Sequence, residues 1–278
     1  MIRQKSFEND VPTLYLVATP IGNLSEFTPR AIDTLKGVSV IACEDTRTSR
    51  TLLEHYDIHT RLVSYHNFNE EDSANGLLNL LNNGDSIALI SDAGYPLVSD
   101  PGYEVVNKAI ESGFNVVTIS GPSAGVHALV ASGLDTRHYL FYGFMNKPKK
   151  ELSDLVNFPY TMIFYESPHR IMDTLNTAYE ILGDRKAVIA RELTKKHEEY
   201  IRGRLSEMIE LEDLKGEIVL MIEGHNKKEI VIDFYQIKDM VDEYIGQGMS
   251  SKDAIKQVSK DCGIAKNDVY REYHNLKS

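Results

Sequence analysis

Five short apolar runs alternate with helix-like segments up to residue 120, and this rhythm limits the possible folds more than any other feature of the chain. The runs are LYLVAT (14–19), VSVIAC (38–43), RLVSY (61–65), SIALIS (86–91) and NVVTIS (115–120). Strands that are apolar along their whole length are typical of sheets covered on both faces, and helical connections favour parallel pairing. The pattern therefore predicts an α/β domain with a mostly parallel sheet.

The rhythm changes after Gly121, where strand-like runs follow one another with less helix between them. These runs are YLFYGF (139–144), TMIFYE (161–166), AVIARE (187–192), EEYIRGR (198–204) and EIVLMIEG (217–224). Their spacing predicts a second α/β domain with a mixed sheet. We place the boundary between the two domains near residue 120, in ISGPSAG.

The C-terminal end of the chain has only helical patterns. Two helix-like segments lie on either side of Gly263, and Ser250 or Ser251 is a suitable N-cap for the first of them. This arrangement is typical of a helix-turn-helix. The predicted organisation is a loose leader (1–12), an N-terminal α/β domain (13–120), a second α/β domain (121–228) and a helix-turn-helix-like module (229–278).

The charge balance weighs against a protein that binds nucleic acid over its whole surface. The chain has 30 Lys and Arg against 41 Asp and Glu, a net charge of −11, whereas counterion release requires clustered cations. Two local basic stretches, 184–204 and 145–150, are candidates for an RNA contact. No apolar run approaches the roughly 18 to 20 residues of a membrane helix. We therefore expect no membrane partner. Because the two cysteines offer neither a disulfide framework nor a zinc cage, we also expect a reduced, cytoplasmic protein.

Four loops rich in glycine, proline, serine and threonine follow predicted strands. They are ATPIGN (18–23), CEDTRTS (43–49), SDAGYPLVSDPG (91–102) and SGPSAG (120–125). In an open α/β sheet, ligands bind beyond the carboxyl ends of the strands, although any strand-to-helix connection also needs turn residues. The chain has no GxxxxGK[ST] and no GxGxxG after its first strand. The loops favour a small ligand that is held by backbone groups and carries no triphosphate.

Acidic residues in these loops raise the question of a metal site. Glu44, Asp45, Asp92 and Asp100 are possible ligands, but the histidines show neither HExxH nor HxH spacing, and we expect no metal. Asp100 is instead predicted to be the N-cap of the next helix, with Pro101 at the first helical position.

Six motifs, taken in order, resemble those of the tetrapyrrole methylase-like (class III) S-adenosylmethionine-dependent methyltransferases. They are LVATPIGNLSEFTPRA, IACEDTRTSRTLL, SDAGYPLVSDPG, ISGPSAGVHALVASGL, FYESPHRI and IARELTKKHEE. Members that modify tetrapyrroles carry a GxGPG-like first loop where this chain has ATPIG, which favours the RNA-modifying branch. The resemblance implies 2′-O-methylation of a cytidine ribose in the decoding region of small-subunit (16S) ribosomal RNA.

The resemblance also implies that the cofactor S-adenosyl-L-methionine lies folded between the two α/β domains. It would be held by the first-strand loop, the Gly-x-Pro loop after the fourth strand, the domain junction and the strand ends of the second domain. The residues at these positions are Pro20, Ile21, Asp92, Gly94, Tyr95, Pro96, Val98, Ser123, Ala124, Tyr165, Glu166 and Leu193.

The catalytic residues are less clearly indicated. A ribose hydroxyl is a poor nucleophile, and it benefits from a base or from a cation that stabilises the developing alkoxide. Asp45 and Arg47 are the leading pair, Glu192 and Lys195 are further candidates, and Glu166 is a possible base. Two alternatives stay open: Asp45 as a helix N-terminal charge paired with Arg47, and Glu166 as part of a capped helix start.

The predicted partners are small-subunit ribosomal RNA or the 30S particle, and the resemblance implies a homodimer. Two other functions remain possible from the sequence. One is a tetrapyrrole (precorrin-type) C-methyltransferase of the same fold. The other is a DNA-binding regulator that uses the C-terminal helices.

Overall fold

In the computed structural model, the five apolar runs of the N-terminal domain form one sheet. Its strands are β1 (Thr13–Val17), β2 (Val40–Cys43), β3 (Arg61–Ser64), β4 (Ile87–Ile90) and β5 (Asn115–Ile119). They lie in the order β3-β2-β4-β1-β5, and every neighbouring pair is parallel. The predicted parallel sheet is therefore confirmed. Because β1 and β4 are neighbours, the loops that follow them begin side by side.

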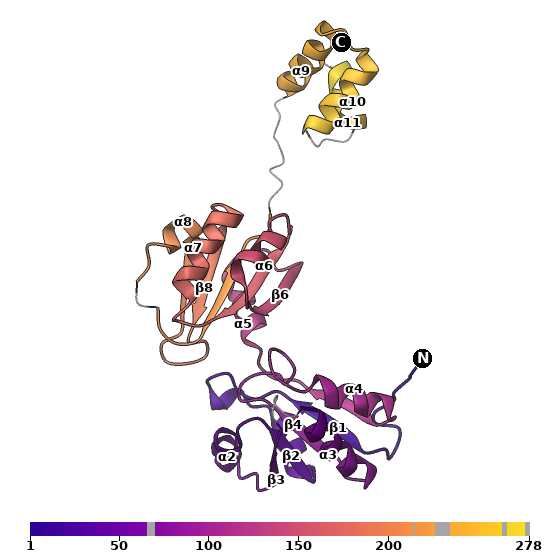
Figure 1. Ribbon diagram of the computed structural model, residues 1–278, viewed down its shortest axis with the longest axis vertical. Helices are drawn as coiled ribbons and strands as arrows, with labels where there is room; N and C mark the ends of the chain where they lie inside the picture. The colour runs from indigo at the N-terminus through magenta and orange to yellow at the C-terminus, as the bar shows by residue number, and fades with distance from the viewer. Residues whose placement is uncertain (66–69, 213, 226–233, 263–265, 276–278) are drawn as a thin grey trace. The chain divides into compact units, whose positions relative to one another are not determined.

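Helices cover both faces of this sheet (Figure 1). One face packs against α1 (Pro29–Gly37) and α2 (Thr46–His55), and the other against α3 (Glu70–Asn82) and α4 (Tyr103–Glu111). A short 3₁₀ turn, η1 (Leu24–Glu26), precedes α1. Since β2 and β4 are buried at every position, their sequences are apolar throughout and do not alternate with polar residues.

The second sheet is mixed, as the sequence predicts. It contains β6 (Tyr139–Phe144), β7 (Thr161–Glu166), β8 (Lys186–Arg191), β9 (Glu199–Arg204) and β10 (Ile218–Ile222), in the order β6-β7-β10-β8-β9. Only β6 and β7 pair in parallel; the other three pairs are antiparallel.

The two faces of the second sheet are covered differently. One packs against α6 (Pro148–Asp154), α7 (Ile171–Leu182) and α8 (Leu205–Met208). The other packs against α5 (Ala124–Ser132), and Ile21 from the first-strand loop belongs to the same apolar cluster. The N-terminal domain thus contributes a side chain to the core of the second domain, beside the carboxyl end of β1.

The structure describes residues 1–65, 70–212, 214–225, 234–262 and 266–275. By its contacts the chain divides into two compact units, Met1–Gly224 and His225–Ser278. Both α/β domains lie in the first unit. Among the helices of the described ranges, none combines the length and the apolarity that crossing a membrane requires.

The C-terminal unit is a small helical module with its own core. It contains α9 (Phe234–Gly246), α10 (Ser251–Cys262) and α11 (Lys266–Asn275), which share one cluster of buried apolar side chains. Ser250 caps α10, because its Oγ accepts a hydrogen bond from the Asp253 N–H at 3.2 Å. Gly263 and the predicted start of the module at 229 lie outside the described residues.

Candidate functional site

A cavity of about 420 Å³ lies between loops at the carboxyl ends of the first sheet and the α5-covered face of the second sheet. The loops after β1, β4 and β5 form one side, and the ends of β7, β8 and β10 form the other. Its volume lies within the range of roughly 300 to 1,000 Å³ that small-molecule sites occupy. Three of the four strand-end loops singled out in the sequence therefore enclose a space suited to a small ligand, whereas CEDTRTS (43–49) does not contribute to its lining.

The loop after β4 is held in place by its backbone. Thr19 and Gly94 exchange two backbone hydrogen bonds, with N···O distances of 2.8 and 3.0 Å, which tie this loop to the loop after β1. The Ser91 hydroxyl also donates to the Gly94 carbonyl at 3.0 Å. Gly94 has φ +78°, a left-handed conformation that glycine adopts without a steric penalty. The conformation of the loop therefore explains why SDAG has a serine at 91 and a glycine at 94.

Two tyrosine hydroxyls hold the junction between the domains. The Gly121 N–H donates to the Tyr95 hydroxyl at 3.0 Å, and the Gly125 N–H donates to the Tyr165 hydroxyl at 3.2 Å. A Cβ atom on Gly121 would lie 2.7 Å from the Ala18 Cβ, so this loop packs directly on the end of β1. Since Tyr95 and Tyr165 come from different domains and both line the cavity, they fix its shape from two sides.

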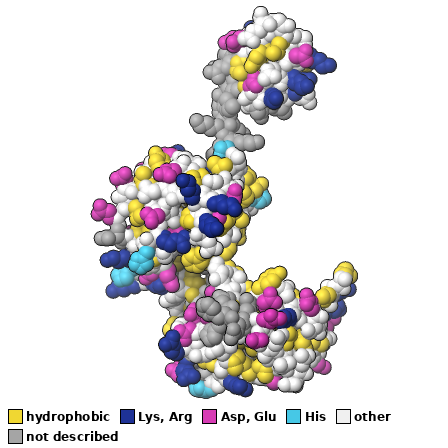
Figure 2. Space-filling model, viewed as in Figure 1, with side chains coloured by type: hydrophobic (Ala, Val, Ile, Leu, Met, Phe, Trp, Pro, Cys, Tyr) yellow, Lys and Arg dark blue, Asp and Glu magenta, His cyan; other side chains and the backbone are white. Residues whose placement is uncertain are grey.

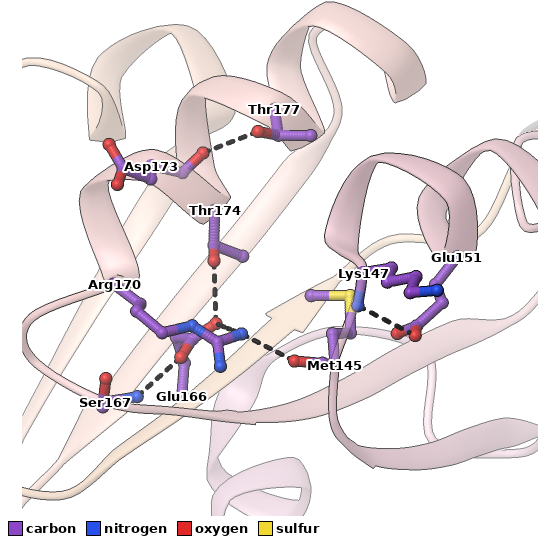
Figure 3. Close-up of polar contacts among 9 residues, drawn as sticks. All are labelled: Met145, Lys147, Glu151, Glu166, Ser167, Arg170, Asp173, Thr174 and Thr177. Atoms are coloured by element: carbon purple, nitrogen blue, oxygen red, sulfur yellow. Dashed lines mark hydrogen bonds and ion pairs between the residues drawn. The ribbon is translucent and has the colours of Figure 1, made fainter.

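Glu166 lies at the end of β7 as a buried carboxylate with three donors (Figure 3). Its side chain is 0% exposed. It accepts hydrogen bonds from the Ser167 N–H at 2.8 Å, the Thr174 hydroxyl at 2.7 Å and Arg170 Nη2 at 3.3 Å. Arg170 Nη2 also donates to the Met145 carbonyl at 2.6 Å. These contacts make Glu166 an organiser of the cavity wall and leave it poorly placed to act as a base. The capped-helix alternative is wrong as well, because α7 begins at Ile171 without a side-chain cap and Glu166 is buried.

Carboxylates gather where β2 and β4 end. Burial, followed by the negative charges of Glu44 and Asp92, raises the pKa of Asp100 to about 6. Burial and the charge of Asp45 also raise the pKa of Asp92. Both Asp92 and Asp100 line the cavity, which is therefore acidic on the side of the N-terminal domain. Such a site favours a ligand with a positive charge.

Comparison with known proteins identifies the family. The model of a family described as tetrapyrrole (corrin/porphyrin) methylases matches residues 13–209. The chain belongs to the tetrapyrrole methylase family. It is 46% identical to the "Ribosomal RNA small subunit methyltransferase I" of Bacillus subtilis (strain 168), over 98% of each chain. It is 47% identical to the protein of that name from Halalkalibacterium halodurans, over 99% of each chain.

Solved structures agree on the fold. The crystal structure of diphthine synthase matches with a TM-score of 0.62, covering 76% of this chain and 89% of that chain. At 12% identity this likeness concerns the fold alone. Together with the family match, it confirms the predicted architecture: two α/β domains of the tetrapyrrole methylase type with a cleft between them, followed by a helical module.

Most residues that the family resemblance points to as cofactor contacts are brought together by the fold. All of them line the cavity except Pro20 and Pro96. Pro20 follows the buried Thr19 in the first-strand loop, and Pro96 is buried next to Tyr95. The contacts of these residues with a cofactor stay a prediction.

The predicted catalytic residues lie outside the lining of the cavity. Asp45 caps α2 by accepting from the Arg47 N–H at 2.8 Å, and its carboxylate pairs with the Arg47 guanidinium at 3.0 Å. Hydrogen bonding to Arg47 lowers the pKa of Asp45 to about 2, so it is a weak base. Lys195 bridges two carboxylates, at 3.0 Å from Glu192 and 2.8 Å from Glu217. Both pairs have structural partners; their catalytic roles stay predictions.

Asp100 is not the N-cap that its sequence position predicts. The helix α4 begins only at Tyr103, its N-cap is Gly102 with φ +138°, and no side chain caps it. Leu97 and Ser99 both adopt left-handed φ values, +69° and +68°, and the chain turns through them before the helix starts. This extra turn lets Asp100 line the cavity. SDPG is a normal helix-start pattern, so nothing in its local sequence indicates the longer turn.

Several further residues line the cavity without having been predicted to do so. They are Ala93, Ser99, Asp100, Phe144, Ser167, Pro168, Gly216, Glu217, Ile218 and Val219. The segment 216–219 begins β10, which is central in the second sheet but late in the chain. Because β10 pairs with β7 and β8, its start lies beside Glu166 and Arg191 in the register. Only this antiparallel pairing, which the sequence does not specify, places 216–219 at the cavity.

The basic stretch 184–204 is largely engaged within the protein. Arg185 is 8% exposed and donates to three backbone carbonyls. Arg191 pairs with Glu199, Arg202 donates to the carbonyls of Ala131 and Ser132, and Arg204 pairs with Asp184. Figure 2 shows both Lys and Arg and Asp and Glu side chains on the visible face of the second α/β domain. As a continuous cationic surface for RNA, the stretch is therefore weaker than its sequence indicates.

Proposed function

We propose that this chain is an S-adenosylmethionine-dependent methyltransferase that methylates the 2′-hydroxyl of a cytidine in the decoding region of small-subunit ribosomal RNA. The observation that carries the proposal is 46–47% identity, over 98–99% of the chain, to proteins named ribosomal RNA small subunit methyltransferase I. A site at the strand ends of two α/β domains supports it. We place the reaction in the cytoplasm, where small ribosomal subunits would be the partner.

The cavity fits S-adenosyl-L-methionine by its chemistry. Asp92, Asp100 and Glu217 complement a sulfonium and an ammonium group, while Ile21, Leu193 and Val219 form an apolar wall for an adenine. When bound, the cofactor supplies an electrophilic methyl group.

We assign the proton acceptor to Asp100. The ribose 2′-hydroxyl must lose its proton as its oxygen is methylated, and a base is most effective when its pKa lies near the working pH. Among the carboxyl groups that line the cavity, Asp100 has a pKa of about 6 because of its burial and its acidic neighbours. It is mostly ionised at neutral pH and is a stronger base than an ordinary aspartate. This assignment replaces Asp45 as base but leaves Arg47 available for RNA.

Arg47 is suited to hold a phosphate of the RNA. Its side chain is 90% exposed, and it is oriented by Asp45 at the start of α2. Lys195 is positioned in a similar way by Glu192 and Glu217 beside the cavity. We propose that both cations orient the RNA backbone, and that Asp45 and Glu192 position them.

Arg47→Ala is expected to raise the KM for small-subunit RNA by about 3- to 10-fold, because one phosphate contact of roughly 1 kcal/mol is lost. Cofactor affinity, measured by calorimetry, should stay unchanged. Arg137→Ala is the matched control, since Arg137 forms a comparable exposed pair with Asp135. An Arg47→Ala enzyme with normal RNA affinity and a full single-turnover rate would contradict the role of Arg47.

The function is tested by mapping ribose methylation in small-subunit RNA with and without the protein. Labelled S-adenosylmethionine is supplied with 30S particles, with free small-subunit RNA, or with a precorrin. Transfer to one cytidine 2′-oxygen of the RNA is expected. Transfer to the precorrin alone would favour the tetrapyrrole alternative, and sequence-specific duplex binding without methyl transfer would favour the regulator.

We further propose that the protein acts as a homodimer and that its C-terminal module contacts the small subunit. We propose that α9–α11 help to dock the enzyme on the small subunit, because the module has its own core and carries lysines such as Lys252 and Lys256 on its exposed surface. Deleting the residues after about 230 should then weaken binding to 30S particles while cofactor affinity is kept. Unchanged affinity for the particles would rule out docking.

A further inference from the structure

A second cavity, of about 490 Å³, adjoins the cofactor cavity. It is lined by the loop after β4, by β6 and by Asn146 shortly after β6. Val98, Ser99 and Phe144 line both cavities, so the two spaces are adjacent and share a wall. A group bound in the second cavity would therefore lie next to the cofactor and to Asp100.

Three of the seven residues that line the second cavity are aromatic. Phe141, Tyr142 and Phe144 come from β6, the parallel edge strand of the second sheet. Phe144 is 54% exposed, and its ring meets the Tyr165 ring at 5.5 Å between centroids. An exposed phenylalanine at the mouth of a cofactor site presents a flat apolar surface of the kind on which nucleobases stack.

The backbone on both sides of this cavity has an uncommon conformation. Leu97 and Ser99 have φ +69° and +68° although neither is a glycine. Across the cavity, Gly143 has φ +78°, at an irregularity in the pairing of β6 with β7. A Cβ on Gly143 would lie 2.9 Å from Ser99 Oγ. The packing of these segments against each other holds Leu97 and Ser99 in an energetically unfavourable backbone conformation. Such conformations are common at binding sites.

Positive charge lies directly beyond the aromatic strand. Lys147, Lys149 and Lys150 follow Phe144 within six residues in the sequence. Lys147 is the N-cap of the short helix α6 and follows Asn146 of the second cavity, and Lys149 and Lys150 lie in the first turn of α6. The Lys147 N–H donates to the Glu151 carboxylate at 3.0 Å, while all three lysine side chains belong to exposed residues. Cations next to a stacking surface are the arrangement that binds a single-stranded nucleotide together with its phosphates.

We propose that the second cavity holds the nucleobase of the target nucleotide, stacked on Phe144, while Lys147, Lys149 and Lys150 bind the adjacent phosphates. The inference rests on the proposed function and names where its RNA substrate binds. The shared wall would place the ribose of that nucleotide between the stacked base and Asp100. To enter, the base must be unpaired and turned out of its RNA stack.

The test compares Phe144→Ala, Phe144→Leu and Phe144→Trp in methylation of 30S particles. Loss of base stacking should raise the KM for the particle by about 5- to 100-fold in both the Ala and the Leu variants. Phe144→Trp should keep the KM within about 3-fold of wild type, since a larger ring still stacks. Tyr139→Ala is the matched control: Tyr139 is an exposed aromatic at the other end of β6 and lines neither cavity.

A normal KM in Phe144→Leu would overturn the proposal, because an apolar side chain without a ring would then suffice. Melting temperature and cofactor affinity are measured for each variant. These measurements distinguish misfolding and damage to the cofactor site from the loss of nucleobase stacking. If wild-type protein methylates no small-subunit RNA, the proposed function fails. The base site is then tested by the fluorescence of a single-stranded RNA carrying pyrrolocytidine: quenching by wild type but not by Phe144→Ala supports it, and equal quenching contradicts it.

Discussion

Replacing Asp100 with asparagine is expected to lower the single-turnover rate of methyl transfer by about 100- to 1,000-fold, the contribution typical of a positioned general base. Asparagine keeps the size and polarity of the side chain but cannot accept the proton. Cofactor affinity should change much less than the rate, because Asp92 and Glu217 keep the cavity acidic. Rates are measured at saturating 30S particles in a rapid-quench assay, and cofactor affinity is measured by calorimetry.

The same substitution should change the pH dependence of the rate. In wild type, the rate is expected to fall below pH 6 as Asp100, with a pKa of about 6, becomes protonated. Besides burial, the charges of Glu44 and Asp92 raise this pKa, and a hydrogen bond with the Ser91 side chain lowers it. Asp100 in turn contributes to the raised pKa of Tyr165, which is mainly due to burial. Asp100→Asn should lose this acid limb. Glu217→Gln, at an exposed carboxylate of the same cavity, is the control and should keep it.

As the pH rises through about 6, the rate of methyl transfer should increase while the stability of the protein decreases. Because the folded state raises the pKa of Asp100, its neutral form is favoured on folding, and its stabilising effect is lost as the pH rises through about 6. The asparagine side chain in Asp100→Asn stays neutral, so the variant should melt higher than wild type at pH 8, and the difference should shrink toward pH 5. A full-rate Asp100→Asn enzyme, or one that melts lower than wild type at pH 8, would contradict this account of Asp100.

Replacing Glu166 with alanine is expected to reduce the free energy of unfolding by about 2–4 kcal/mol. The substitution removes the acceptor of the buried Thr174 hydroxyl and of the Ser167 N–H, and unsatisfied buried donors cost roughly 1–3 kcal/mol each. It also leaves Arg170 without its carboxylate. For a unit of this size, the melting temperature should fall by about 5–15 °C, as followed by circular dichroism.

Two further variants separate the causes of this loss. Glu166→Gln keeps an acceptor oxygen and should lose less than Glu166→Ala. Glu217→Ala removes an ion pair in which the carboxylate is 75% exposed, and it should cost no more than about 1 kcal/mol. Equal melting temperatures for Glu166→Ala and Glu217→Ala would contradict the structural role of Glu166.

Much of the architecture follows from the order of residues alone. Strands buried on both faces must be apolar at nearly every position, so β1, β2, β4 and β5 stand out as runs, and helix starts such as Thr28-Pro29 carry their own signal. The loops at the carboxyl ends of parallel strands must lie at one edge. Hence the edge at which the cavity lies and the loops that reach it, with the glycine at 94, were predictable before any coordinates. The family resemblance named half of the residues that line the cavity.

The roles of single charged residues were not predictable in this way. Asp45 and Asp100 both stand in a helix-start pattern after a strand, yet one caps its helix and has a pKa of about 2, while the other lines the cavity with a pKa of about 6. The difference comes from the turn at Leu97–Ser99 and from neighbours such as Glu44, far away in the sequence. Likewise, only the fold buries Arg185 and leaves Lys149 exposed.

The sequence by itself determined the two α/β domains, the edge at which the cavity lies and the family, because these depend on local periodicity and on motifs read in order. The tertiary structure decided which carboxylate has a raised pKa, which cations are exposed and where β10 completes the cavity. Those properties depend on burial and on charges brought together from distant segments, and electrostatic effects of this kind change with a few ångströms of displacement.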